Sequence, residues 1–109
     1  MATIKLDIYS EKDKKKVEKT YTADGYDLML GTVEDFMEII DLDKLDDNIE
    51  VAKMVVKAYG KIKPLLKDIF PELTDSEFKR VKVPDLVLTI IQLGNAVLES
   101  LNTLNTGKN

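Results

Sequence analysis

The sequence predicts a mainly helical α+β fold, in which an N-terminal β-hairpin is followed by four or five helices, the last one long. Apolar and polar residues alternate over much of residues 3–22, which is the period of a half-buried strand. Beyond residue 24 the apolar residues recur at three- and four-residue steps, which is the period of a helix. Only three prolines and five glycines interrupt the chain, so long regular elements are permitted.

The length of the chain indicates one domain. Its 109 residues are too few for two independent cores. With 44% hydrophobic and 33% charged residues, the composition is that of a folded globular chain. We expect the hairpin at about residues 3–22, the helical part at about 25–104 and a frayed tail at 105–109.

The hairpin is predicted from two alternating runs. Ile4, Leu6 and Ile8 are the apolar positions of the first run, and residues 17–22 form the second. The polar stretch 10–15 between them suits a loop. Because an isolated two-stranded hairpin is barely stable in water, it must lie on helices or pair with another chain.

The helical period predicts a first helix from Asp24 to Ile40. Gly31 interrupts it, and Thr32 with Asp35 resembles a capping box, which would restart the helix there. The acidic stretch 41–48 is predicted as a loop that ends in N-cap candidates, Asp47 and Asn48. A second helix then carries an apolar stripe that ends near Gly60: Ile49, Ala52, Val55, Val56 and Tyr59.

Prolines and caps divide the second half of the chain. Pro64 suits the first turn of a short helix over 64–70, and Thr74 with Glu77 forms a capping box that opens a brief helix through Arg80. The longest helix starts at 83–85. Its apolar positions are Leu86, Ile90, Leu93, Val97, Leu101 and Leu104.

Composition excludes most catalytic and metal sites. The chain has no histidine and no cysteine, so it lacks the usual general base, the usual zinc ligands and any disulfide. The acidic loop fails as a calcium site, because an EF-hand beginning at Asp41 would place Leu45 at position 5 and Ala52 at position 12. No glycine-rich phosphate loop occurs. We expect no enzyme activity, no catalytic residue, no metal and no cofactor.

Charge is segregated along the chain. Asp24 to Glu50 contains ten acidic residues and one basic residue, whereas Lys53 to Lys82 contains eight basic and four acidic residues. These blocks are either solvated helix faces or surfaces that meet within the monomer or between copies. A formal net charge of −4 argues against nucleic-acid binding, although Lys53, Lys57 and Lys61 would form a helical stripe.

The last helix is unusual because residues 86–104 contain one charge, Glu99. Its polar residues and its lack of a basic flank argue against membrane insertion. Two alternatives stay open: a central core helix, or a helix with one face left for a partner or another subunit. The predicted partner or self-association surface combines this helix with the apolar turn before it: Leu65, Leu66, Ile69, Phe70, Ile90, Leu93, Val97 and Leu101.

With these segments placed, the chain resembles the tail assembly chaperones of long-tailed phages (siphophages) or prophages of Gram-positive bacteria. Besides the charged hairpin at 4–22, four runs carry the likeness: Tyr26 to Met37 (YDLMLGTVEDFM), Val51 to Tyr59 (VAKMVVKAY), Leu66 to Thr74 (LKDIFPELT) and Asp85 to Ile91 (DLVLTII). The likeness lies in the overall pattern and not in a sharp motif.

The resemblance implies a non-enzymatic role in the host bacterial cytoplasm, which agrees with an N-terminus that lacks a signal peptide. The implied partners are the tape measure protein, the major tail protein and further copies of the chain, with no membrane. The family often makes a longer product by ribosomal frameshifting, and the codons of residues 107–109 would test for a slippery run. Alternatives are a structural tail or tail-completion component, or a small regulatory protein-binding module.

Overall fold

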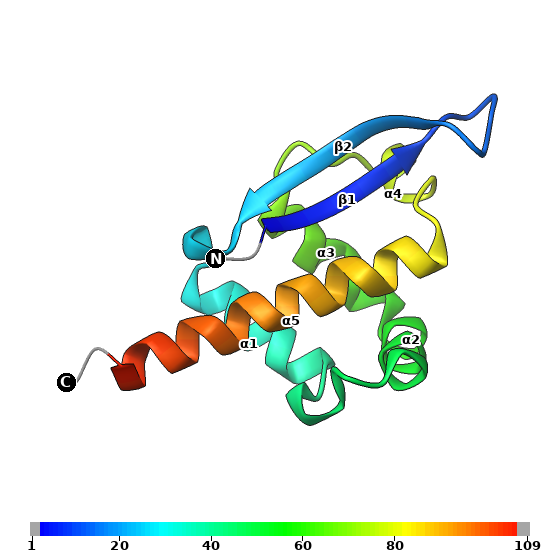
Figure 1. Cartoon of the computed structure of the whole chain (residues 1–109). Helices are drawn as coiled ribbons and strands as arrows, with labels where there is room; N and C mark the ends of the chain where they lie inside the picture. The colour runs from blue at the N-terminus through cyan, green and yellow to red at the C-terminus, as the bar shows by residue number, and fades with distance from the viewer. Residues whose placement is uncertain (1–2, 107–109) are drawn as a thin grey trace.

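The computed structural model of the chain describes residues 3–106, and the side chains of residues 3–102. It confirms the predicted fold class, an antiparallel hairpin followed by five helices with a long last one (Figure 1). The elements in chain order are β1 (Thr3–Tyr9), β2 (Val17–Asp24), the 3-10 turn η1 (Gly25–Asp27), α1 (Leu30–Ile39), the 3-10 turn η2 (Leu42–Lys44), α2 (Asn48–Lys57), α3 (Tyr59–Ile69), α4 (Asp75–Phe78) and α5 (Val83–Thr106).

The hairpin lies on the helical part with β1 against the helices (Figure 1). Ile4, Leu6 and Ile8 of β1 are fully buried, because alternate residues of a strand point to the same face. Most of β2 is exposed, and Tyr21 is its buried residue. The hairpin is therefore stabilised by packing on helices, which was one of the two expected arrangements.

Long-range hydrogen bonds join the outer edge of β1 to α5. The Lys5 amide donates to Gln92 Oε1 at 2.8 Å, and the Thr89 hydroxyl donates to the Lys5 carbonyl at 2.6 Å. Further along the strand, the Tyr9 hydroxyl donates to Asp85 Oδ2 at 2.6 Å. These bonds fix the direction of β1 relative to α5 and occupy part of a sheet edge that would otherwise be open.

Helix α5 is the centre of the molecule, since it contacts β1, η1 and α2 (Figure 1). Its buried apolar residues are Leu86, Val87, Ile90, Leu93, Ala96 and Val97. At Gly94 a Cβ atom would lie 2.5 Å from Leu45 Cδ1, so the missing side chain lets the segment after η2 approach the helix. The core interpretation of the last helix holds for most of its described length.

The first helix starts later than the sequence suggested. Asp24 caps η1 by accepting a hydrogen bond from the Tyr26 amide, and the backbone is extended at Leu28 and Met29, so α1 begins at Leu30. The predicted restart at Thr32 is wrong: Thr32 lies inside α1 and is buried. A residue whose side chain faces the core cannot serve as an exposed N-cap.

The second helix begins as predicted, whereas the third starts earlier than predicted. Asp47 is the N-cap of α2 and accepts hydrogen bonds from two amides of the first turn. Ala58 then ends α2 and begins α3, so Pro64 lies inside α3 and not at its first turn. Pro64 has no N–H to donate to the preceding turn, which is a local cost that the buried contacts of this helix outweigh.

The C-terminal half otherwise follows the prediction. Thr74 and Glu77 form both hydrogen bonds of the capping box at the start of α4. Helix α5 runs from Val83 to Thr106, so it includes Asn105 and Thr106, the first two residues of the predicted tail. Residues 107–109 lie outside the described part of the chain.

Candidate functional site

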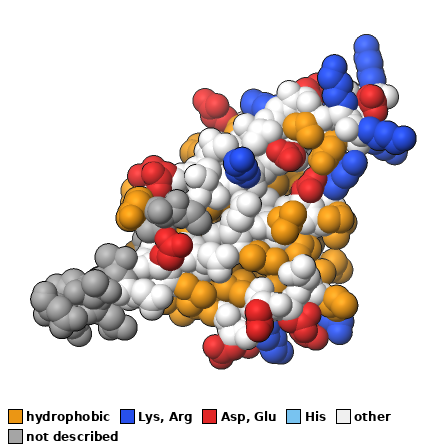
Figure 2. Space-filling view, viewed as in Figure 1, with side chains coloured by type: hydrophobic (Ala, Val, Ile, Leu, Met, Phe, Trp, Pro, Cys, Tyr) orange, Lys and Arg blue, Asp and Glu red, His pale blue; other side chains and the backbone are white. Residues whose placement is uncertain are grey.

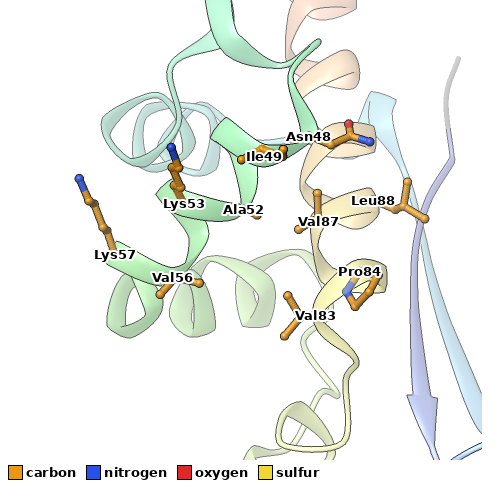
Figure 3. Close-up of a pocket in the computed structure, with 10 residues that line it drawn as sticks. All are labelled: Asn48, Ile49, Ala52, Lys53, Val56, Lys57, Val83, Pro84, Val87 and Leu88. Atoms are coloured by element: carbon orange, nitrogen blue, oxygen red, sulfur yellow. The ribbon is translucent and has the colours of Figure 1, made fainter.

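An apolar groove runs between α2 and the first turns of α5. Its volume is about 760 Å³. Figure 3 shows Ile49, Ala52 and Val56 on the α2 side, facing Val83 and Val87 of α5. The full lining is Asn48, Ile49, Ala52, Lys53, Val56, Lys57, Val83, Pro84, Val87 and Leu88.

The groove exposes large aliphatic side chains that no described part of the chain covers. Exposure reaches 69% for Ile49, 67% for Val56, 60% for Val83 and 53% for Leu88. Single exposed apolar residues are ordinary on a protein surface, but a contiguous group of them marks an interaction site. In Figure 2 the hydrophobic side chains gather at the lower right, over this part of the molecule.

Helix α2 exposes these residues because it is apolar on more than one face. Val51 and Val55 point inward and are buried, and they anchor the helix to the core. Ile49 and Val56 lie on a neighbouring face, which remains open beside α5. The stripe predicted from sequence thus combined an inward face with a groove face.

Two lysines form the outer rim of the groove. Lys53 and Lys57 extend from α2 on the side away from α5 (Figure 3). Lys53 lies 3.6 Å from Glu50, an exposed pair, while Lys57 makes no ion pair among the described residues. The rim is therefore positively charged, beside an apolar floor.

The lining offers little for chemistry. Asn48 is its one side-chain amide, and the two lysine amines are its only titratable groups. A volume of this size can accommodate a small molecule, but such sites usually have several convergent polar groups. Between residues 3 and 106, the structure shows no group of acidic residues arranged to hold a metal ion, and no helix long and apolar enough to cross a membrane.

The surface predicted from sequence lies mostly in the core. Ile69 is partly buried and Leu101 is 39% exposed. Six of the eight predicted residues are buried in the monomer: Leu65, Leu66, Phe70, Ile90, Leu93 and Val97. Their side chains belong to the one core that the hairpin and the helices share, so in this structure they do not form a surface.

The lysine stripe considered for DNA binding is broken. Lys53 and Lys57 belong to α2, whereas Lys61 follows the change of direction at Ala58 and belongs to α3. The groove residues Val83, Pro84 and Leu88 were not singled out from sequence. The sequence of α2 did contain a signal for them. Its apolar residues occupy more than one face, and each apolar face of a helix needs a neighbouring element to cover it.

A partly buried polar cluster joins β2 to α4 outside the groove. The Tyr21 hydroxyl donates to Glu77 Oε1 at 2.6 Å, and Lys19 Nζ lies 3.5 Å from the other oxygen. The Tyr21 hydrogen bond, assisted by Thr74 and Lys19, lowers the pKa of the Glu77 carboxyl to about 2. These groups satisfy one another, so the cluster is structural.

Comparisons of the chain with protein-family models, curated proteins and solved structures gave no match. What the fold and the groove define is a class: a small α+β protein with an apolar, lysine-rimmed groove about two helical turns long.

Proposed function

We propose that this chain is a non-enzymatic protein-binding module whose groove between α2 and α5 holds the apolar face of a partner helix. The observation that carries the proposal is the group of large aliphatic side chains, each more than half exposed, that line one groove. Covering them removes apolar surface from water. This burial contributes a favourable free energy of about 25 cal/mol per Å², which is the main favourable term in association.

The shape of the groove favours a helical partner. Ile49 and Val56 are seven residues apart on α2, about two turns of helix, which suits apolar anchors at i, i+3/i+4 and i+7 on a partner helix. The positive rim formed by Lys53 and Lys57 favours acidic residues beside that apolar face.

The resemblance to siphophage tail assembly chaperones gives the proposal its particular form. In that form, the client is the tape measure protein, held before the tail tube polymerises around it, and the major tail protein is a second partner in the host cytoplasm. An apolar groove supports the idea because a chaperone must cover apolar helical segments of its client through weak contacts.

Co-expression with the tape measure protein of the same genome tests the proposal. The chain should raise the soluble fraction of the client, and Val56→Asp combined with Leu88→Asp should remove most of that effect, because two charges would enter the apolar floor. Both positions are exposed, so circular dichroism should show unchanged helix content.

Val17→Asp is the matched control, because Val17 is an exposed valine on β2 and not part of the groove. This variant should keep the solubilising effect. Equal solubilisation by the wild type and the groove variant would show that the client does not use this groove.

A further inference from the structure

A second exposed apolar surface lies on η1 and α1. Leu30 is 74% exposed, Met29 72%, Tyr26 70% and Met37 49%. Leu30 and Met37 are seven residues apart and follow one face of α1, with half-buried Val33 between them. We call Leu30, Val33 and Met37 the α1 stripe. Methionine suits such a surface because its flexible side chain adapts to different partners.

The α1 stripe repeats the pattern of the α2 wall of the groove. On α1 the stripe residues follow one another at steps of three and four, and Ile49, Ala52 and Val56 on α2 follow the same steps. The inward residues also correspond: Thr32 and Phe36 are the buried residues of α1, and Val51 and Val55 those of α2. Both helices therefore expose an apolar strip of equal length at the same angle from their buried face.

The charges beside the two strips are opposite. Glu34 and Glu38 are exposed on α1, and Lys53 and Lys57 occupy the equivalent places on α2. Each charged residue is one position after an apolar strip residue, and each pair is spaced by four residues. Residues four apart are neighbours on one helix face, so each pair forms a short charged edge along its strip.

These positions determine how the two strips would pack. On both helices the charged edge lies on the same side of the apolar strip when each helix is viewed from its N-terminus. When two right-handed helices pack face to face, such edges meet if the helices are antiparallel and lie on opposite sides if they are parallel. An antiparallel pair would bring Glu34 towards Lys57 and Glu38 towards Lys53, while the apolar strips make contact.

We infer that, in the absence of a client, the groove between α2 and α5 is occupied by α1 of a second copy of this chain, in the antiparallel orientation. The inference rests on the proposed helix-binding role of the groove and assigns it a second occupant. Because client and second copy would share Val56 and the lysine rim, client binding and self-association should compete.

The contact is expected to be weak and salt-sensitive. A helix of ten residues covers less than the ~1,600 Å² of a standard stable interface, so association should depend on protein concentration. Exposed charge pairs are screened at high ionic strength, where the Debye length falls to ~3 Å at 1 M salt. The weight-average mass should therefore rise with protein concentration and fall as salt is added.

Charge exchange tests the inference by sedimentation and light scattering on the full chain. Glu34→Lys with Glu38→Lys places lysines on both edges, and Lys53→Glu with Lys57→Glu places glutamates on both. Each double variant alone should remain monomeric. An equimolar mixture should recover the wild-type concentration dependence, because every contact between the two variants then joins opposite charges. The variant with all four changes should self-associate alone.

Two outcomes would overturn the inference: a wild-type chain that stays monomeric at low salt up to millimolar concentration, or double variants that associate as well as the wild type. Neither outcome affects the proposed function, because the Glu34→Lys, Glu38→Lys variant keeps the groove and can still be tested for solubilising the tape measure protein. If self-association and its charge dependence appear but the client is not solubilised, the proposed function fails while the inference stands.

Discussion

At the scale of single residues, Glu77 joins two parts of the fold through its carboxylate. One oxygen accepts hydrogen bonds from the Tyr21 hydroxyl and the Thr74 amide, and Lys19 lies near the other. The pKa of Glu77 in the folded chain is about 2, below the ordinary value of about 4.3 expected in the unfolded chain. The stabilisation is therefore fully present above about pH 4.3 and is lost as the pH falls towards 2.

Tyr21→Phe should lower the free energy of unfolding by about 1–2 kcal/mol near neutral pH, because the ring stays buried and only the hydroxyl is removed. It should also flatten the fall in stability below pH 4.3. Urea denaturation at pH 7, 4 and 2.5 measures both effects. Tyr26→Phe is the control, since the Tyr26 ring is largely exposed and its hydroxyl makes no hydrogen bond within the described residues.

At the scale of elements, the close approach of the η2 segment to α5 depends on Gly94. Gly94→Ala would place a methyl group 2.5–2.7 Å from both terminal carbons of Leu45, which is itself buried, so that side chain must move. We expect a net loss of about 1–2 kcal/mol, because overpacking costs roughly 1–3 kcal/mol and the gain in helix propensity offsets up to about 1.

Thermal unfolding of four variants tests this expectation: Gly94→Ala, Leu45→Ala, the two combined, and one control. Gly60→Ala is the matched control, because a Cβ at Gly60 meets nothing within 4 Å; its melting temperature should stay the same or rise slightly. Adding Leu45→Ala to Gly94→Ala should cost less than the two single losses added together, since the smaller side chain removes the clash. A simple sum would show that Leu45 and Gly94 do not interact.

At the scale of the whole molecule, hairpin and helices share one hydrophobic core. Ile4 of β1, Phe36 of α1, Leu66 of α3 and Leu93 of α5 belong to the same cluster of buried residues. A chain of this size with one core should unfold in a single transition. We expect the hairpin to be at most marginally stable without the helices.

Leu93→Asp and Leu88→Asp should therefore differ sharply, although both place the same charge on α5. Leu93 is fully buried, so an unpaired carboxylate there should lower the free energy of unfolding by at least about 3 kcal/mol. The helices and the hairpin should then unfold together. Leu88 is more than half exposed, so its variant should stay folded and be impaired only in partner binding. Circular dichroism with amide-resolved NMR separates the two cases, and a folded Leu93→Asp chain would contradict the single core.

The sequence by itself determined the features that depend on neighbours along the chain. The alternation of Ile4, Leu6 and Ile8 and the caps at Asp47 and Thr74 involve residues within a few positions of one another. Their hydrogen bonds and facing directions follow from local geometry, so the hairpin, the order of helices and the long last helix were predicted correctly.

Only the tertiary structure decided which apolar faces are covered. The position of Pro64 inside α3, the burial of Thr32 and the exposure of Val56 depend on segments distant in sequence. Periodicity reports that a helix has an apolar face but not which neighbour covers it. Leu93, for which periodicity alone leaves both core and partner surface open, lies in the core, whereas Ile49 and Leu88 remain open because no described element of the chain covers them.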